Sequence, residues 1–149
     1  MTQKECKDLF LRDLTQEEKE LLLKDLCARL PYGVKIKLGN YDYQVCGYSP
    51  EIKELPLKIW YYYKKNSKSY IDVYLEDYLP YLRPMSSMTE EEEIEYETIA
   101  KPCYNIFYVD NSLKGIDWLN KNHFDYRGLI EKGLAIEVTE ENNPYKSYK

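Results

Sequence analysis

The spacing of apolar residues changes from a helical period to a strand period at residues 31–33, and this change constrains the fold more than any other feature. Before it, Leu22 and Leu26 lie at i, i+4 spacing, which places them on one side of a helix. After it, Val34 and Ile36 alternate with lysines, as in a strand with one buried face. The chain is therefore expected to pack an amphipathic helix against a following sheet.

The predicted helix has defined ends. It begins at Thr15, because Thr15 and Glu18 form a capping box in which each side chain can accept a hydrogen bond from the other residue's backbone N–H. Pro31 and Gly33 end it, since proline cannot continue a helix and glycine readily adopts a left-handed conformation. Its apolar side is expected to face the core.

Four strands are predicted after this helix, at residues 34–38, 41–45, 57–64 and 70–76. Gly39 and Asn40 form the first turn, where Gly39 can supply the positive φ of a type II′ hairpin. On the third strand, one face is expected to carry Lys58, Trp60, Tyr62 and Lys64. The short connections favour an antiparallel meander.

The C-terminal half is predicted to be mainly helical. Pro80 and Pro84 interrupt the strand pattern. Ser86, Ser87 or Thr89 then caps a helix that Pro102 ends, and Thr89 forms a second capping box with Glu92. The remaining expected elements are short strands at residues 104–108 and 134–138, a helix at 113–122 and a short helix at 125–132.

Together these elements predict a single α+β domain over residues 1–139, followed by a loose polar tail over residues 140–149. The sheet is expected to be mainly antiparallel, with about four to six strands. It packs with the N-terminal helix and with C-terminal helices. No internal repeat and no linker divides the chain.

The residue inventory argues against several classes of protein. The N-terminus is polar and no apolar run approaches the roughly 20 residues of a membrane span, so a cytoplasmic protein is expected. Four cysteines and a single histidine match no zinc motif, and no glycine-rich phosphate loop is present. We therefore expect no metal, no cofactor and no catalytic residue, and four reduced thiols that are mostly buried.

The net charge of −5 arises from one segment. Residues 88–99 contain six glutamates and no basic residue, so the rest of the chain is close to neutral. Glutamates suit the positive end of a helix dipole, and a solvated helix start explains the cluster. A nucleic-acid-binding protein would usually carry a basic face instead.

Tyrosine is the unusual component of this sequence. There are 17 tyrosines, against three phenylalanines and two tryptophans. Tyrosine suits half-exposed sheet positions, so sheet packing alone can explain this abundance. Its apolar ring and polar hydroxyl also suit a protein interface. Because lysines such as Lys64 lie among the rings, a platform for single-stranded nucleic acid is a third interpretation.

Two further places carry candidate binding residues. Arg83 lies between two prolines, where it either binds an anion or pairs with nearby glutamates. If the helix over residues 113–122 continues, His123 lies on its apolar side as a core or capping residue. Asp125 and Arg127 lie close to it in sequence, so a ligand contact there is the alternative.

Three stretches carry a resemblance to known proteins: residues 26–33 (LCARLPYG), 81–92 (YLRPMSSMTEEE) and 117–135 (DWLNKNHFDYRGLIEKGLA). Together they resemble small uncharacterised proteins encoded by bacteriophages and prophages of gut Bacteroidales. The resemblance implies a phage or mobile-element protein in a bacterial host cell, and it implies no catalytic residues.

The leading hypothesis is a small non-enzymatic phage protein that binds a partner protein in the host cytoplasm, such as a host enzyme or defence component. One alternative is an accessory protein that binds single-stranded nucleic acid. Another is a small-ligand-binding protein or enzyme with a pocket near His123 and Arg127. The candidate binding residues are Trp60, Tyr62, Lys64, Tyr74, Arg83, His123, Asp125 and Arg127. No membrane partner is expected.

Overall fold

The computed structural model describes residues 14–49, 57–64, 67–100 and 111–145. Its helices are α2 (Gln16–Arg29), α3 (Glu90–Ala100) and α4 (Asn111–Lys121). Its strands are β1 (Lys35–Leu38), β2 (Tyr41–Ser49), β3 (Leu57–Lys64), β4 (Ser67–Val73), β5 (Leu79–Pro84), β6 (Phe124–Asp125) and β7 (Ile136–Glu137). Short 3-10 turns η1 (Leu30–Tyr32), η2 (Leu75–Asp77) and η3 (Met85–Ser87) follow α2, β4 and β5.

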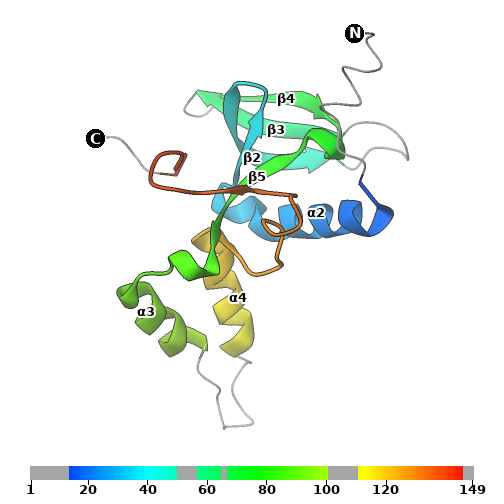
Figure 1. Ribbon diagram of the computed structural model, residues 1–149. Coiled ribbons are helices and arrows are strands. Elements are labelled where there is room, and N and C mark those ends of the chain that lie inside the picture. The colour runs from blue at the N-terminus through cyan, green and yellow to red at the C-terminus, as the bar shows by residue number, and fades with distance from the viewer. Residues whose placement is uncertain (1–13, 50–56, 65–66, 101–110, 146–149) are drawn as a thin grey trace.

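The strands form one sheet in the order β4-β3-β2-β1-β5-β6, with β7 also paired to β5. β1 to β4 make the antiparallel meander that the alternation predicts, and β1 also pairs antiparallel with β5. β6 and β7 run parallel to β5. The predicted α+β class with a mainly antiparallel sheet is thus confirmed (Figure 1). Gly39 has the expected positive φ, at +62°.

β5 corrects the prediction that Pro80 and Pro84 exclude a strand. The Leu82 carbonyl accepts a hydrogen bond from Val138 beside β7, so Pro80, two residues earlier, faces the same edge of β5. β7 pairs only with Tyr81 and Leu82, so no hydrogen bond between these strands requires an N–H at Pro80. Pro84 is the last residue of the strand. Both prolines are therefore compatible with the sheet.

α2 covers one face of the meander, as its apolar side predicts (Figure 1). Leu22 and Leu26 on α2 pack with Ile36, Val45 and Ile59 on the strands, and all five side chains are buried. Burying such side chains contributes about 1.5–3 kcal/mol each. The core is therefore the contact between this helix and the inner face of the meander.

Both predicted capping boxes are present. The Thr15 hydroxyl accepts from the Glu18 N–H at 3.1 Å, and the Glu18 carboxylate accepts from the Thr15 N–H at 3.0 Å. Thr89 and Glu92 make the same two contacts at the start of α3, each at 3.1 Å. Thr15 therefore begins α2 as predicted, and of the three caps that the sequence allowed for the next helix, Thr89 is the one that begins α3.

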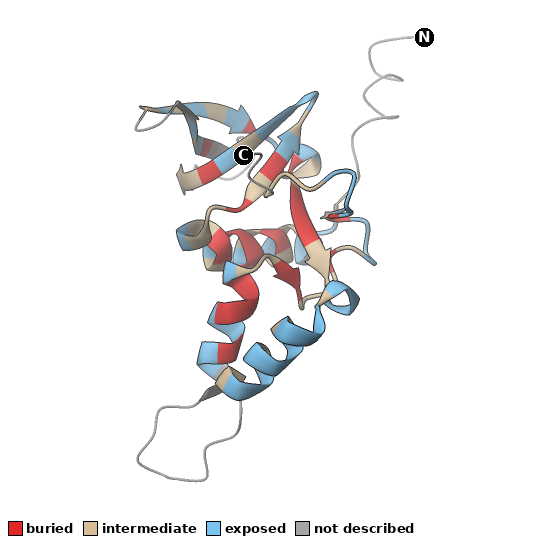
Figure 2. Cartoon of the chain, turned by 90° about the vertical axis from the view of Figure 1, so that its left-hand side faces the viewer, coloured by how far each residue is buried: buried red, intermediate tan, exposed pale blue. Residues whose placement is uncertain are grey.

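α3 and α4 pack together at the opposite end of the molecule from the meander (Figure 1). Trp118 on α4 and Phe124 on β6 form a second buried cluster, against which Tyr96 of α3 packs. A Cβ at Gly115 would lie 2.8 Å from Ala100 Cβ, so this glycine allows the two helices to approach closely. α3 is otherwise largely exposed (Figure 2).

Three predicted elements differ in the structure. The fourth strand, expected at residues 70–76, lies at Ser67–Val73, because residues 75–77 turn as η2 instead of continuing the alternation. β7 contains two residues of the strand expected at 134–138, since it pairs with only two residues of β5. Residues 126–132 contain turns rather than the expected helix.

Other expectations are corrected or fall outside the described ranges. Cys27, predicted to be buried, is exposed, because it lies at the edge of the apolar side of α2. Its Sγ lies 3.0 Å from the Tyr48 hydroxyl. The strand expected at 104–108 and the helix end at Pro102 lie outside the residues that the structure describes.

Candidate functional site

Three large aromatic side chains lie side by side on the sheet face that α2 leaves uncovered. Trp60 and Tyr62 on β3 alternate with the buried Ile59, and Tyr70 on β4 lies opposite Trp60. Their exposed fractions are 36% for Trp60, 40% for Tyr62 and 52% for Tyr70. We call Trp60, Tyr62 and Tyr70, with the neighbouring Lys68, the aromatic face.

Contacts within the aromatic face order its side chains. The Trp60 and Tyr70 rings are tilted, with centroids 5.2 Å apart. Lys68 Nζ lies 5.5 Å from the centroid of the Tyr62 ring, as in a cation–π contact. Gly47 on β2 lies opposite Trp60, so bare backbone borders the indole. Because these groups are already packed, a partner that binds them loses little affinity to side-chain ordering.

The predicted strand residues are only partly brought together. Trp60 and Tyr62 both lie on the aromatic face. Tyr74 follows the end of β4 and is 53% exposed. Lys64 is the last residue of β3, and its side chain lies outside the described part. Tyr70 was not predicted for binding, although its alternation with Ile71 signalled an outward side chain.

The charges around the aromatic face are mixed. Lys68 and Asp72 lie four residues apart on β4, and Lys37 on β1 lies opposite Asp42 on β2. All four side chains are exposed. Within the described residues of this face, no row of basic side chains follows the aromatic rings. A single-stranded nucleic-acid platform would need such a row to contact phosphates.

Arg83 pairs with a glutamate, which is one of the two roles that the sequence allows. Its two terminal nitrogens donate to the two carboxylate oxygens of Glu92, each at 2.8 Å. The guanidinium also lies 4.1 Å from the centroid of the Phe124 ring. The hydrogen bond from Arg83 lowers the pKa of Glu92 below its ordinary value. The Arg83 guanidinium is thus engaged in structural contacts.

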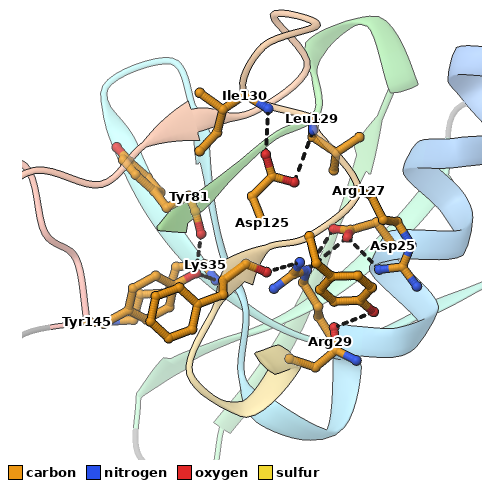
Figure 3. Close-up of polar contacts among 12 residues, drawn as sticks. Asp25, Arg29, Lys35, Tyr81, Asp125, Arg127, Leu129, Ile130 and Tyr145 are labelled. Atoms are coloured by element: carbon orange, nitrogen blue, oxygen red, sulfur yellow. Dashed lines mark hydrogen bonds and ion pairs between the residues drawn. The ribbon is translucent and has the colours of Figure 1, made fainter. Parts of the chain in front are cut away.

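A buried ionic network joins α2 to the segment around β6 (Figure 3). Asp25 accepts from Arg29 Nε at 2.9 and 3.0 Å and from Arg127 Nη1 at 2.9 Å. Arg29 Nη2 donates to the Phe124 carbonyl at 2.6 Å. Sequence reasoning missed this network. The sequence feature that could have predicted it is the i, i+4 spacing of Asp25 and Arg29, which places both on the buried side of α2 with Leu22 and Leu26.

Asp125 holds the turn that follows β6 (Figure 3). Its carboxylate oxygens accept from the backbone N–H groups of Leu129 at 3.0 Å and Ile130 at 2.9 Å. It therefore caps this segment as predicted, although the segment forms turns. Arg127 also lies over the Tyr126 ring, at 4.4 Å from its centroid. These contacts occupy Asp125 and Arg127, which weighs against a ligand site near His123 and Arg127.

His123 corrects the prediction that it lies on a helical face. α4 ends at Lys121, and His123 adopts a left-handed conformation with φ of +64°. Its ring stacks on Tyr145, with centroids 3.6 Å apart and planes 8° from parallel. Burial, followed by the positive charge of Arg29, lowers the pKa of His123 to about 4. The imidazole is therefore neutral near pH 7.

Tyr145 fills a gap along one edge of β5 (Figure 3). On this edge Leu79 pairs with β1, and the Arg83 N–H donates to the residue before β6. Tyr81 lies between them, and its carbonyl accepts from the Tyr145 hydroxyl at 2.8 Å. The same hydroxyl accepts from the Lys35 N–H at 2.9 Å. The segment expected to be a loose tail therefore contains a residue that joins β1 to β5.

Comparison of the chain with protein-family models, with curated proteins and with solved structures finds no match. In the described ranges, no group of three or more His, Cys, Asp or Glu side chains is arranged to hold a metal ion. No helix of these ranges is long and apolar enough to cross a membrane. The resemblance to phage proteins therefore stays a prediction, and the aromatic face is the strongest candidate for a functional surface.

Proposed function

We propose that this chain is a non-enzymatic binding protein that recognises a partner protein through its aromatic face. The observation that carries the proposal is the packed, exposed group of Trp60, Tyr62 and Tyr70 on one uncovered sheet face. Tryptophan and tyrosine are enriched at the centres of protein interfaces, where they supply most of the binding energy. Exposed aromatic side chains gathered in this way are uncommon on a surface without a partner.

The mixed charges of the described part of the face fit a protein partner. On β4 the face carries one basic and one acidic side chain, Lys68 and Asp72. β1 and β2 likewise carry one of each, Lys37 and Asp42. A protein interface commonly has such a mixed polar rim around an aromatic centre. The resemblance to phage-encoded proteins makes a bacterial host protein, such as an enzyme or a defence component, the first partner to seek.

Affinity capture with matched variants tests the proposal. The tagged chain, a Trp60→Ala/Tyr62→Ala variant and a Tyr41→Ala control are each incubated with host extract. Tyr41 is 69% exposed but lies off the aromatic face. We expect one protein to be retained by the native chain and the control and lost from the double variant, with the purified pair then reproducing this pattern in titrations.

Two results would contradict the proposal. The first is a partner that binds the double variant as tightly as the native chain, which would place the binding surface elsewhere. The second is salt-dependent binding of a single-stranded oligonucleotide that the double variant loses, because counterion release from phosphates would then identify the ligand as nucleic acid.

A further inference from the structure

β4 is the edge strand of the meander. It pairs with β3 along one side, and no other strand of the described ranges pairs with its second side. In Figure 1 it lies along the margin of the sheet, away from α3 and α4. A free strand edge presents backbone N–H and C=O groups that can pair with another strand. The side chains of β4 therefore determine which strand can join the sheet.

The sequence of β4 is complementary to itself in the antiparallel direction. Lys68, Tyr70 and Asp72 point outward, and Val73 at the end of the strand is buried on the inner side. If two copies of β4 pair antiparallel with Tyr70 opposite Tyr70, each Lys68 lies opposite Asp72 of the other copy. Opposite charges facing each other across an antiparallel pair are stabilising.

The neighbouring registers lack this match. Centring the pair on Ser69 places Lys68 opposite Tyr70, and centring it on Ile71 places Asp72 opposite Tyr70. Lys68 and Asp72 are both exposed and make no ion pair with another described residue. Lys68 contacts the Tyr62 ring, and Asp72 lies opposite Lys58 on β3. The charges of β4 thus favour one register, in which Lys68 and Asp72 of the two copies face each other.

We infer that two copies of this chain associate through β4 into a symmetric dimer with a continuous sheet. The two-fold axis passes between the two Tyr70 residues, perpendicular to the sheet, so both inner faces stay on one side. The two aromatic faces then join into one surface across the axis. This inference goes beyond the proposed function, because it rests on the Lys68 and Asp72 charges and not on a partner protein.

Charge exchange provides the test. Lys68→Glu places two acids at each charged position of the pair, and Asp72→Lys places two bases there, so each single variant should associate more weakly, on the order of tenfold or more. Lys68→Glu/Asp72→Lys restores opposite charges and should dimerise as the native chain does. An equimolar mixture of the two single variants should form the heterodimer, since each charge then faces its opposite.

Sedimentation equilibrium of the full chain from about 10 µM to about 1 mM measures these constants. Circular dichroism of each variant checks that it is folded. If a single variant does not fold, concentration-dependent protection of β4 amides from hydrogen exchange in the native chain supplies the second measurement. A native chain that is monomeric throughout this range would overturn the inference, and so would a dimer whose stability the single variants leave unchanged.

The outcome separates this inference from the proposed function. A monomeric native chain that still binds its partner through Trp60 would reject the β4 dimer alone. A charge-dependent dimer with no partner sensitive to Trp60→Ala/Tyr62→Ala would reject the proposed function alone.

Discussion

Arg29 Nε donates to both carboxylate oxygens of Asp25, at 3.0 and 2.9 Å, and neither side chain is exposed to solvent. The pair lies on α2, one turn apart, and is held from the other side by Arg127 and by the Phe124 carbonyl. It therefore joins the helix that covers the meander to the segment that follows α4. A buried pair of this kind is sensitive to the loss of one partner, because without Arg29 the charge of Asp25 is compensated by Arg127 alone.

Arg29→Met is expected to lower the free energy of unfolding by about 3–5 kcal/mol. The variant leaves Asp25 buried with Arg127 as its remaining cationic partner and removes the hydrogen bond to Phe124. Urea unfolding followed by circular dichroism measures the change.

Asp25→Leu/Arg29→Met is the matched control for this prediction. It removes both charges, so its loss should be clearly smaller than the sum of the losses in Asp25→Leu and Arg29→Met. Losses that simply add would show that the two side chains act independently.

The single histidine should make stability depend on pH between about 6.5 and about 4. His123 has a folded-state pKa of about 4, so between these values the unfolded chain binds a proton that the folded chain does not. The free energy of unfolding should therefore be unaffected by His123 above pH 6.5. It should fall by up to about 3 kcal/mol as the pH drops to 4, and His123 should cause no further loss below pH 4.

His123→Asn isolates this effect, since asparagine tolerates the left-handed conformation and does not titrate. The variant should lose the change between pH 6.5 and 4 and keep the decline below pH 4.5 that protonation of Glu92 causes. Unfolding curves at half-unit pH steps, with NMR titration of the only imidazole, make the comparison. An ordinary pKa for His123 would contradict the prediction.

Local patterns allowed much of the fold to be predicted. The capping boxes at Thr15 and Thr89 lie where the sequence places them, because a capping box depends only on residues three apart. The meander followed in the same way from alternation and short turns. The outward direction of Trp60 and Tyr62 could be predicted from the two-residue period of the strand alone.

Long-range pairing accounts for what the sequence did not predict. β5 contains two prolines, and its parallel partners β6 and β7 are two-residue strands more than 35 residues away in sequence. Tyr145 lies 64 residues beyond the carbonyl that it contacts. Nothing local distinguishes these positions, so a proline-containing segment looked like a break and a polar end looked like a loose tail.

Tyr145→Phe is expected to destabilise the chain by about 1–3 kcal/mol. The change leaves the stacked ring in place but removes the hydroxyl that accepts from Lys35 N–H and donates to the Tyr81 carbonyl. Both backbone groups lose a partner between β1 and β5. Tyr41→Phe, at a site 69% exposed, should change stability by less than about 0.5 kcal/mol in the same assay. Equal effects of the two variants would show that the Tyr145 hydroxyl does not join the strands.

Gly115→Ala should destabilise the contact between α3 and α4, although alanine favours a helix over glycine by about 1 kcal/mol. A Cβ at this position would lie 2.8 Å from Ala100 Cβ and 3.4 Å from the Tyr96 ring, and such overpacking costs about 1–3 kcal/mol. Adding Ala100→Gly removes the clashing methyl group, so the double variant should be more stable than the sum of the single losses predicts. Thermal and urea unfolding of the four chains give the coupling energy between the two positions. Additive losses would show that α3 and α4 separate enough to accommodate the methyl group, in which case Gly115 is not what sets the distance between them.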